Sequence, residues 1–110
     1  MNMMTLDAYS AKIEYDAELD VFRGEILGLT GGADFHGTNP NELRAEFRKS
    51  LRVFLHACHE HGIQPRRIYS GKLNLRIPAD LHEKLAIVAQ AEGKCINTIA
   101  LEALHRRVAV

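Results

Sequence analysis

Apolar and polar residues near the start of the chain alternate in a way that predicts β-strands. The apolar members of the first alternation are Tyr9, Ala11, Ile13 and Tyr15. This period of two is typical of a half-buried strand. The polar segment 16–20 predicts a turn, and 21–29 predicts a second strand in which Gly24 and Gly28 mark a bulge or a close approach. A third short strand is predicted at 33–36.

The period then changes to that of a helix. Asn39 is a favourable N-cap, Pro40 suits the first helical position, and Glu42 follows the cap by three residues, as in a capping box. One apolar stripe follows at helical spacing, formed by Leu43, Phe47, Leu51, Phe54, Leu55 and Cys58. Gly62 is expected to end the helix. These residues predict a small β-β-β-α unit whose helix covers one face of the sheet.

A short segment without periodicity, 66–71, separates this unit from a differently patterned one and is predicted to be a linker. The next six residues alternate again, which predicts a strand. Leu73, Leu75 and Ile77 lie on one side of it, and Lys72, Asn74 and Arg76 on the other.

Two helices are predicted after this strand. Pro78 is expected to open the first, with Asp80 and Glu83 near its positive end, and Gly93 to close it. The apolar stripe of the first helix is Leu81, Leu85, Val88 and Ala89. The second helix is predicted over 96–108, with Ile96, Ile99, Ala100, Ala103, Leu104 and Val108 facing inward.

A single six-residue strand needs a partner for its backbone hydrogen bonds, and no second strand is predicted in this half. The simplest solution is a homodimer in which the strands of two copies pair as an antiparallel ribbon above four helices. The predicted dimer core consists of Leu73, Leu75, Ile77, Leu85 and Leu104. Whether two dimers join into a tetramer is left open.

Such a ribbon fits the major groove of double-stranded DNA. Lys or Arg can donate to guanine and Asn can pair with adenine, so Lys72, Asn74 and Arg76 are the predicted base-reading residues. The N-terminus of the second helix offers backbone N–H groups to a phosphate. The predicted phosphate-contacting residues are Lys94, Cys95, Ile96 and Asn97.

Residues 71–108 resemble the ribbon-helix-helix repressors of the Arc and MetJ type. The resemblance rests on the run from Leu73 to Pro78 and on the run from Gly93 to Asn97 one helix later. It implies the base-reading and phosphate-contacting roles given above. Cys95 departs from the family, which usually has a Ser cap there, so this cap is expected to be weaker by a fraction of ~1 kcal/mol.

Nearly the whole chain also resembles the HicB antitoxins. The residues that carry this resemblance are Phe22-x-Gly24-Glu25, Phe35-x-Gly37, Glu42-Leu43-Arg44 through Ser50, Leu55-x-x-Cys58, Gly62-x-x-Pro65 and Ser70-Gly71-Lys72. The resemblance implies an α+β protein with a partly degraded RNase H-like domain at 1–65 that masks a HicA-type, mRNA-cleaving toxin. The ribbon-helix-helix domain at 72–110 would repress the operon. No catalytic activity and no cofactor are expected.

Composition and charge are compatible with these expectations. Apolar residues make up 46% and charged residues 25%, as in ordinary globular proteins. Residues 1–65 hold six Lys and Arg against ten Asp and Glu, whereas residues 66–110 hold eight against four. An acidic first part suits a basic partner, and a basic second part suits DNA. The start of the chain lacks the features of a signal peptide, no stretch nears the length of a spanning segment, and the two cysteines imply no disulfide, so a cytosolic protein is expected.

Several alternatives remain beside this hypothesis. The cluster of His56, Cys58, His59 and His61 could bind zinc, although an apolar stripe and a helix C-terminus explain it equally simply. A metal-dependent nuclease centre could be built from Asp16, Asp20, Asp34, Glu14 and Glu25. A basic stripe of Arg44, Arg48 and Arg52 could contact RNA or simply be a solvated face. The first domain could instead sense a ligand for a DNA-binding regulator.

Overall fold

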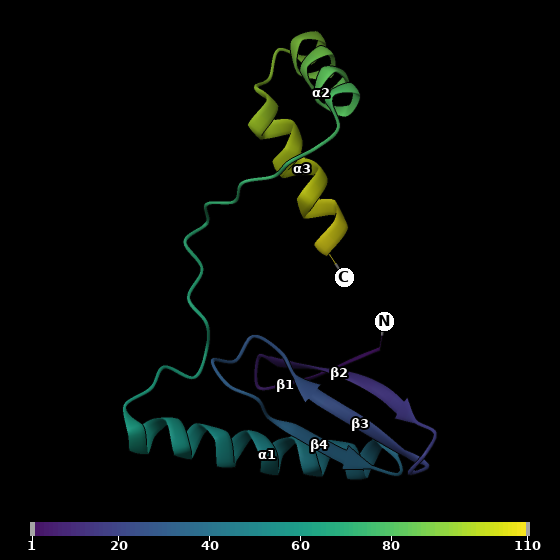
Figure 1. The fold of residues 1–110 in the computed structure, drawn as a ribbon, viewed down its shortest axis with the longest axis vertical. Coiled ribbons are helices and arrows are strands. Elements are labelled where there is room, and N and C mark those ends of the chain that lie inside the picture. The colour runs from purple at the N-terminus through teal and green to yellow at the C-terminus, as the bar shows by residue number, and fades with distance from the viewer. Residues whose placement is uncertain (1, 110) are drawn as a thin grey trace. The chain divides into compact units, whose positions relative to one another are not determined.

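The first part of the chain forms a four-stranded antiparallel sheet, seen in a computed structural model that describes residues 2–109 (Figure 1). The strands are β1 (Met3–Leu6), β2 (Tyr9–Asp16), β3 (Val21–Ile26) and β4 (Asp34–Gly37). They lie side by side in chain order. Each strand pairs with the next, as in a meander, so β1 and β4 are the two edges.

The prediction of a β-β-β-α unit was wrong by one strand, because β1 was missed. This strand has only four residues, and the turn after it is built from Asp7 and Ala8 at φ 49° and 65°, without the Gly or Asn that usually marks such a turn. The second predicted strand is also shorter than expected. It ends at Ile26, and two residues later Gly28 adopts the left-handed conformation at φ 74°.

Helix α1 (Pro40–His61) begins and ends as the sequence predicts. The Asn39 side chain accepts a hydrogen bond of 2.9 Å from the backbone N–H of Glu42, and Pro40 occupies the first turn. The Glu42 carboxylate accepts a bond of 2.7 Å from the Thr38 hydroxyl. Gly62 adopts the left-handed conformation at φ 63° and closes the helix.

One face of the sheet packs against α1 and forms the core of this part of the chain (Figure 1). The buried residues are Ala11, Ile26, Leu29, Ala33, Phe35, Leu43, Phe47 and Leu51. Phe35 of β4 stacks on Phe47 of α1 with ring centroids 5.0 Å apart. The register places Gly24 of β3 opposite Phe35, and the Phe35 ring fills the space that a side chain on Gly24 would need. The predicted close approach at Gly24 is confirmed.

The chain leaves α1 along the loop that follows β3. Leu29 and Arg66 form an antiparallel bridge, and Arg67 donates its backbone N–H to the Gly28 carbonyl at 3.1 Å. The Arg66 guanidinium lies 3.9 Å from the centre of the Tyr9 ring. Both arginines were predicted to be linker residues, but these contacts hold them on the first part of the chain.

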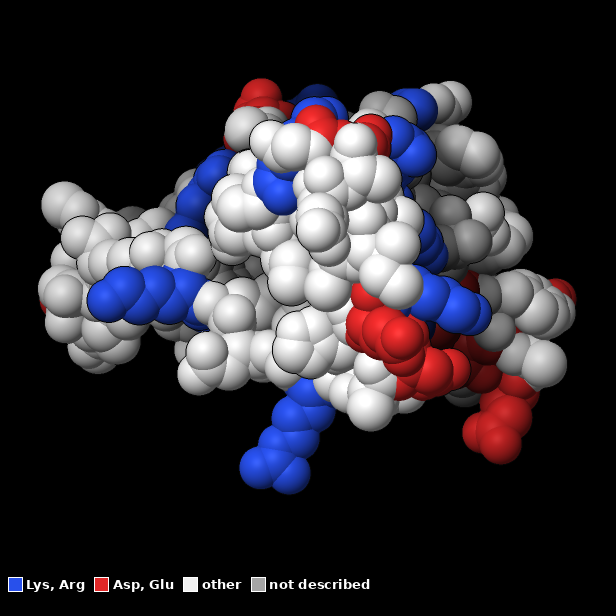
Figure 2. All heavy atoms as spheres, turned by 90° about the horizontal axis from the view of Figure 1, so that it is seen from above, with Lys and Arg blue, Asp and Glu red and all other residues white. Residues whose placement is uncertain are grey.

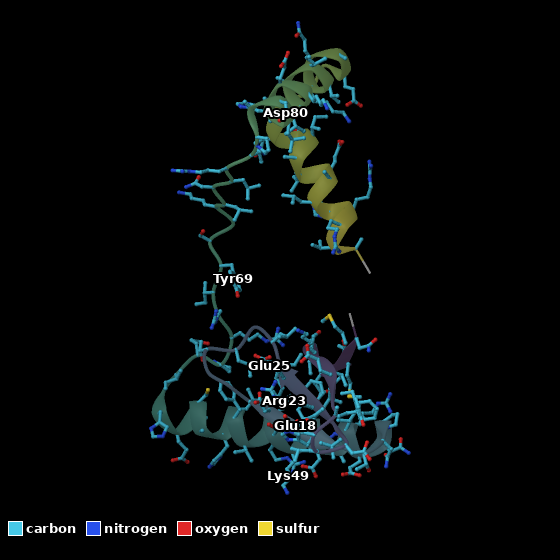
Figure 3. All side chains as sticks on the ribbon, turned by 45° about the vertical axis from the view of Figure 1, so that its right-hand side comes forward. Glu18, Arg23, Glu25, Lys49, Tyr69 and Asp80 are labelled. Carbon is cyan, nitrogen blue, oxygen red and sulfur yellow. The ribbon has the colours of Figure 1, made fainter. Side chains whose placement is uncertain are left out.

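The structure divides into two compact units, Met1–Ser70 and Gly71–Val110. The second unit contains α2 (Ala79–Glu92) and α3 (Ile96–Val108), joined at Gly93, which is left-handed at φ 67°. Pro78 is the residue before α2 rather than its first helical residue. Of the predicted acidic pair only Asp80 lies in the first turn of α2 (Figure 3).

The close contact at Gly24 generates a stability prediction. Gly24→Ala should lower the free energy of unfolding by about 1 to 3 kcal/mol, because the new methyl group must displace a ring that is packed between the sheet and α1. Gly32→Ala is the matched control, since an added carbon there meets no atom within 4 Å, and it should change stability by less than about 0.5 kcal/mol. Urea unfolding of the two variants measures both values. Equal stabilities would contradict the packing described here.

Candidate nucleic-acid interface

The predicted base-reading strand lies in an extended segment, 71–77, that pairs with no strand in the described part of this single chain. Its apolar side chains remain in solvent: Leu73 is 69% exposed, Leu75 61% and Ile77 39%. The polar side chains Lys72 and Arg76 are exposed as well. Apolar and polar side chains of the segment are therefore both exposed, and the described residues of this single chain do not provide the pairing that would make it part of a ribbon.

Between this segment and α3 the second unit is hollowed. The hollow has a volume of about 690 Å³. Its apolar lining residues are Leu73, Leu75, Ala100, Leu101 and Leu104, and Lys72, Asn74 and Asn97 also border it. The hollow between the predicted strand and its own helix is thus bordered by apolar and polar side chains together.

The helices of the second unit bury little of their apolar surface. Among the described residues of α2 and α3 only Ala89 is fully buried. The large apolar side chains left exposed are Leu81, Ile87, Val88, Ile96, Leu101, Leu104 and Val108. Leu85, which the sequence assigns to a dimer core, is half-buried. One copy of this unit lacks the covered core that the first unit has.

The start of α3 holds the predicted phosphate-contacting residues. Cys95 is the N-cap with φ −80° and ψ 157°, and its side chain caps no backbone N–H. A weak cap was expected for a cysteine at this position. The first-turn N–H groups, including those of Ile96 and Asn97, have no acceptor within the helix and can face a bound anion.

The Cys95 side chain has a different partner. Its Sγ lies 3.1 Å from the hydroxyl of Thr98, and this contact lowers the pKa of the Cys95 thiol because the hydroxyl and nearby backbone N–H groups stabilise the thiolate. Thr98 was missed in the sequence, although its spacing of three residues from a helix cap is a usable signal.

Lys94 is held by the helix that it precedes. Its Nζ lies 2.9 Å from Oε1 of Glu102, and this carboxylate raises the pKa of Lys94. Both side chains are exposed, so solvent screens the pair. Glu102 was missed because it lies eight residues away in the sequence. To contact a phosphate, Lys94 would exchange this carboxylate for the new anion.

The carboxylates of the first unit are engaged in separate contacts. Asp34 pairs with Arg23 at 2.6 Å, and this pairing raises the pKa of Arg23. Glu14 pairs with Lys12 at 2.7 Å, which lowers the pKa of Glu14. Asp16 and Asp20 accept hydrogen bonds within the β2–β3 turn. The Asp16 carboxylate accepts a bond of 3.0 Å from the Glu18 N–H, and the Asp20 carboxylate accepts one of 2.5 Å from the Tyr15 hydroxyl. Four of the five residues weighed as a nuclease centre are therefore engaged in ion pairs or in turn hydrogen bonds.

These acidic residues lie on the uncovered side of the first unit. Arg23 and Glu25 alternate with the core residues along β3 and stand on the open face of the sheet, and Glu18 lies in the neighbouring turn (Figure 3). A shallow hollow of about 300 Å³ is lined by Glu14, Asp16, Glu18 and Arg23, among others. Figure 2 shows several Asp and Glu side chains gathered in one area with a basic side chain beside them.

The His-rich end of α1 forms no ligand set. Cys58 is buried in the core stripe, and His56 lies 3.5 Å from Glu60 on the outer side of the helix. No group of three or more His, Cys, Asp or Glu side chains within residues 2–109 is arranged to hold a metal ion. In the same range no helix combines the length and the apolar character needed to cross a membrane.

Comparison with known proteins gives a partial match to the HicB family. The HicB family model matches residues 54–104, just under half of the chain. The match begins in the last turns of α1, continues through 66–77, and includes α2 and most of α3. Neither the curated proteins nor the solved structures give a match. Most of the first unit lies outside the matched range.

The two cysteines should differ in reactivity. Cys95 is exposed and its thiol pKa is lowered, so iodoacetamide should alkylate it with a pH midpoint below the ordinary thiol value of about 8.5, whereas buried Cys58 should react only after unfolding. Thr98→Val should move the Cys95 midpoint upward. Mass spectrometry of the alkylated peptides across pH measures both. A midpoint that does not respond to Thr98→Val would show that the hydroxyl contact does not act on the thiol.

Proposed function

We propose that this chain is a HicB-type antitoxin that represses its own operon as a ribbon-helix-helix dimer and neutralises a HicA-type toxin with its first unit. The observation that carries the proposal is the exposed apolar side of segment 71–77 and of the helices beside it. The HicB family domain at 54–104 supports the same function.

The apolar surface argues for a second copy as the partner of segment 71–77. An extended segment with alternating apolar side chains needs both a backbone partner and a covered face. Pairing of this segment with its copy around a two-fold axis satisfies the backbone groups and brings Leu73, Leu75 and Ile77 of both copies over the hollow beside α3. Four helices then close the core that one copy leaves open.

DNA binding follows from the other side of the same segment. Alternation sends Lys72, Asn74 and Arg76 to the side away from the apolar core, so the dimer presents each of them twice. Their donors and acceptors suit guanine and adenine edges in the major groove. The N-terminus of α3, with Ile96 and Asn97, supplies backbone N–H groups for a phosphate.

Toxin binding is assigned to the first unit on chemical grounds and on the resemblance to HicB antitoxins. An RNA-cleaving toxin needs a basic surface for its substrate, and residues 1–65 carry an excess of carboxylates. Exposed members such as Glu18 and Glu25 stand on the side of the sheet that α1 does not cover. The RNase H-like ancestry of this unit remains an implication of the resemblance.

Dimerisation can be tested with two exposed leucines. Leu75→Lys should raise the dissociation constant at least about a hundredfold, because each copy loses the burial of one Leu, worth roughly 1.5 to 3 kcal/mol. Leu19→Lys is the matched control: Leu19 is 66% exposed, close to the 61% of Leu75, but lies in the turn between β2 and β3. Sedimentation velocity should show a dimer for the wild type and Leu19→Lys and a single chain for Leu75→Lys. A dimer in all three would place the interface elsewhere.

Operator recognition can be separated from toxin neutralisation. Arg76→Ala should cost about 1 to 3 kcal/mol of binding to the DNA upstream of its own reading frame and relax the base preference at one position per half-site. Toxin neutralisation in a growth assay should stay intact. Arg107→Ala, in the last turn of α3, should leave the base preference unchanged. Unaltered operator affinity of Arg76→Ala in a gel-shift titration would refute the ribbon as the reading element.

A further inference from the structure

The outer side of α1 carries a basic hollow that the proposed antitoxin function does not use. It has a volume of about 560 Å³ and lies between α1 and the turn that joins β1 to β2. Its lining residues are Asp7, Arg48, Leu51, Arg52, Leu55, His56 and His59. The stripe of arginines seen in the sequence is therefore more than a solvated helix face, because two of its three members line a concave surface.

The two arginines in this hollow are available to an incoming anion. Arg48 and Arg52 are exposed, one helical turn apart, and neither takes part in an ion pair or hydrogen bond among the described residues. Other arginines of the first unit are engaged: Arg23 with Asp34 and Arg66 with Tyr9. Unpaired guanidinium groups side by side offer the fork geometry that binds phosphate oxygens.

The shape of the hollow suits a chain of phosphates. Its floor is formed by Leu51 and Leu55, which pack toward the sheet and hold α1 in place. From Arg48 to His59 the basic row extends for about 16 Å along the helix. One strand of nucleic acid has a charge about every 3.4 Å, so several phosphates fall within this length. The imidazole of His59 can add an N–H donor at the far end, whereas that of His56 lies 3.5 Å from the Glu60 carboxylate.

We propose that this basic hollow binds the phosphodiester backbone of a nucleic acid. The site involves the first unit alone and is independent of the ribbon, so it holds or fails separately from the proposed repressor function. Asp7 lies at the border of the hollow, and its carboxylate repels a bound anion. This repulsion lowers the affinity for phosphate, so removal of this one charge should raise it. Binding of this kind is independent of base sequence.

The test compares alanine substitutions of arginines inside the hollow with that of an arginine outside it on the same helix. Fluorescein-labelled single-stranded RNA, duplex RNA and duplex DNA of unrelated sequence are titrated with the full-length chain by fluorescence anisotropy, and the tightest probe identifies the source of the phosphates. Arg48→Ala/Arg52→Ala should weaken binding of that probe about tenfold or more and lower the slope of log K against log salt by about 1 to 2. Arg44→Ala, on the same helix but outside the hollow, should weaken it less than about twofold.

Removal of the opposing charge provides a gain-of-function arm. Asp7→Asn should tighten binding of the same probe, and Asn tolerates the left-handed backbone at φ 49°, so the turn is retained. Repeating the DNA titration in Arg76→Ala protein separates the hollow from the ribbon, since the loss caused by Arg48→Ala/Arg52→Ala must persist there. The proposal is overturned if the wild type binds none of the three probes, or if Arg44→Ala weakens binding as much as Arg48→Ala/Arg52→Ala.

Discussion

Too little of the second unit's apolar surface can be covered within one copy of the chain. Leu73 and Leu75 stand in solvent beside a hollow, and α2 and α3 together bury one alanine among their described residues. Two helices with such a surface need a further layer before they have a core. In the proposed dimer, a second copy of segment 71–77 would supply that layer and the backbone partner at once. Dimerisation and DNA reading would then both depend on the alternation of side chains in this segment.

The first unit, in contrast, buries an apolar core within one copy of the chain. Its sheet and α1 enclose a core around Phe35 and Phe47, and the Leu29–Arg66 bridge fastens the end of the unit to the loop that follows β3. Its exposed surface includes carboxylates on the open side of the sheet and arginines along the outer side of α1. Because the first unit has its own core, its surface is available for binding partners, whereas the second unit is proposed to cover its apolar surface by dimerisation.

Local signals in the sequence predicted most of the secondary structure. Asn39 and Gly62 define both ends of α1, and Gly93 separates the last two helices, because capping depends on residues close together in the chain. The strand β1 was missed, since four residues and an Asp7-Ala8 turn carry little signal. The extra strand changes the sheet's edges but not the face that α1 covers.

The candidate site was only partly predictable for a related reason. Alternation identifies which side chains share a side of segment 71–77, but a strand is defined by its pairing partner, which in the proposed ribbon comes from another copy. Contacts between residues far apart in the sequence could not be predicted from local patterns either. The Glu102 carboxylate that engages Lys94 and the concave setting of Arg48 and Arg52 both depend on how helices and turns pack.

Amide hydrogen exchange across residues 72–77 tests the central claim most directly. The ribbon requires that alternate backbone N–H groups of this segment bond to the other copy, so they should exchange slowly at high protein concentration and rapidly after dilution below the dissociation constant of the dimer. The α1 amides should stay protected throughout. Rapid exchange of 72–77 at every concentration, in protein that sedimentation shows to be dimeric, would contradict the account.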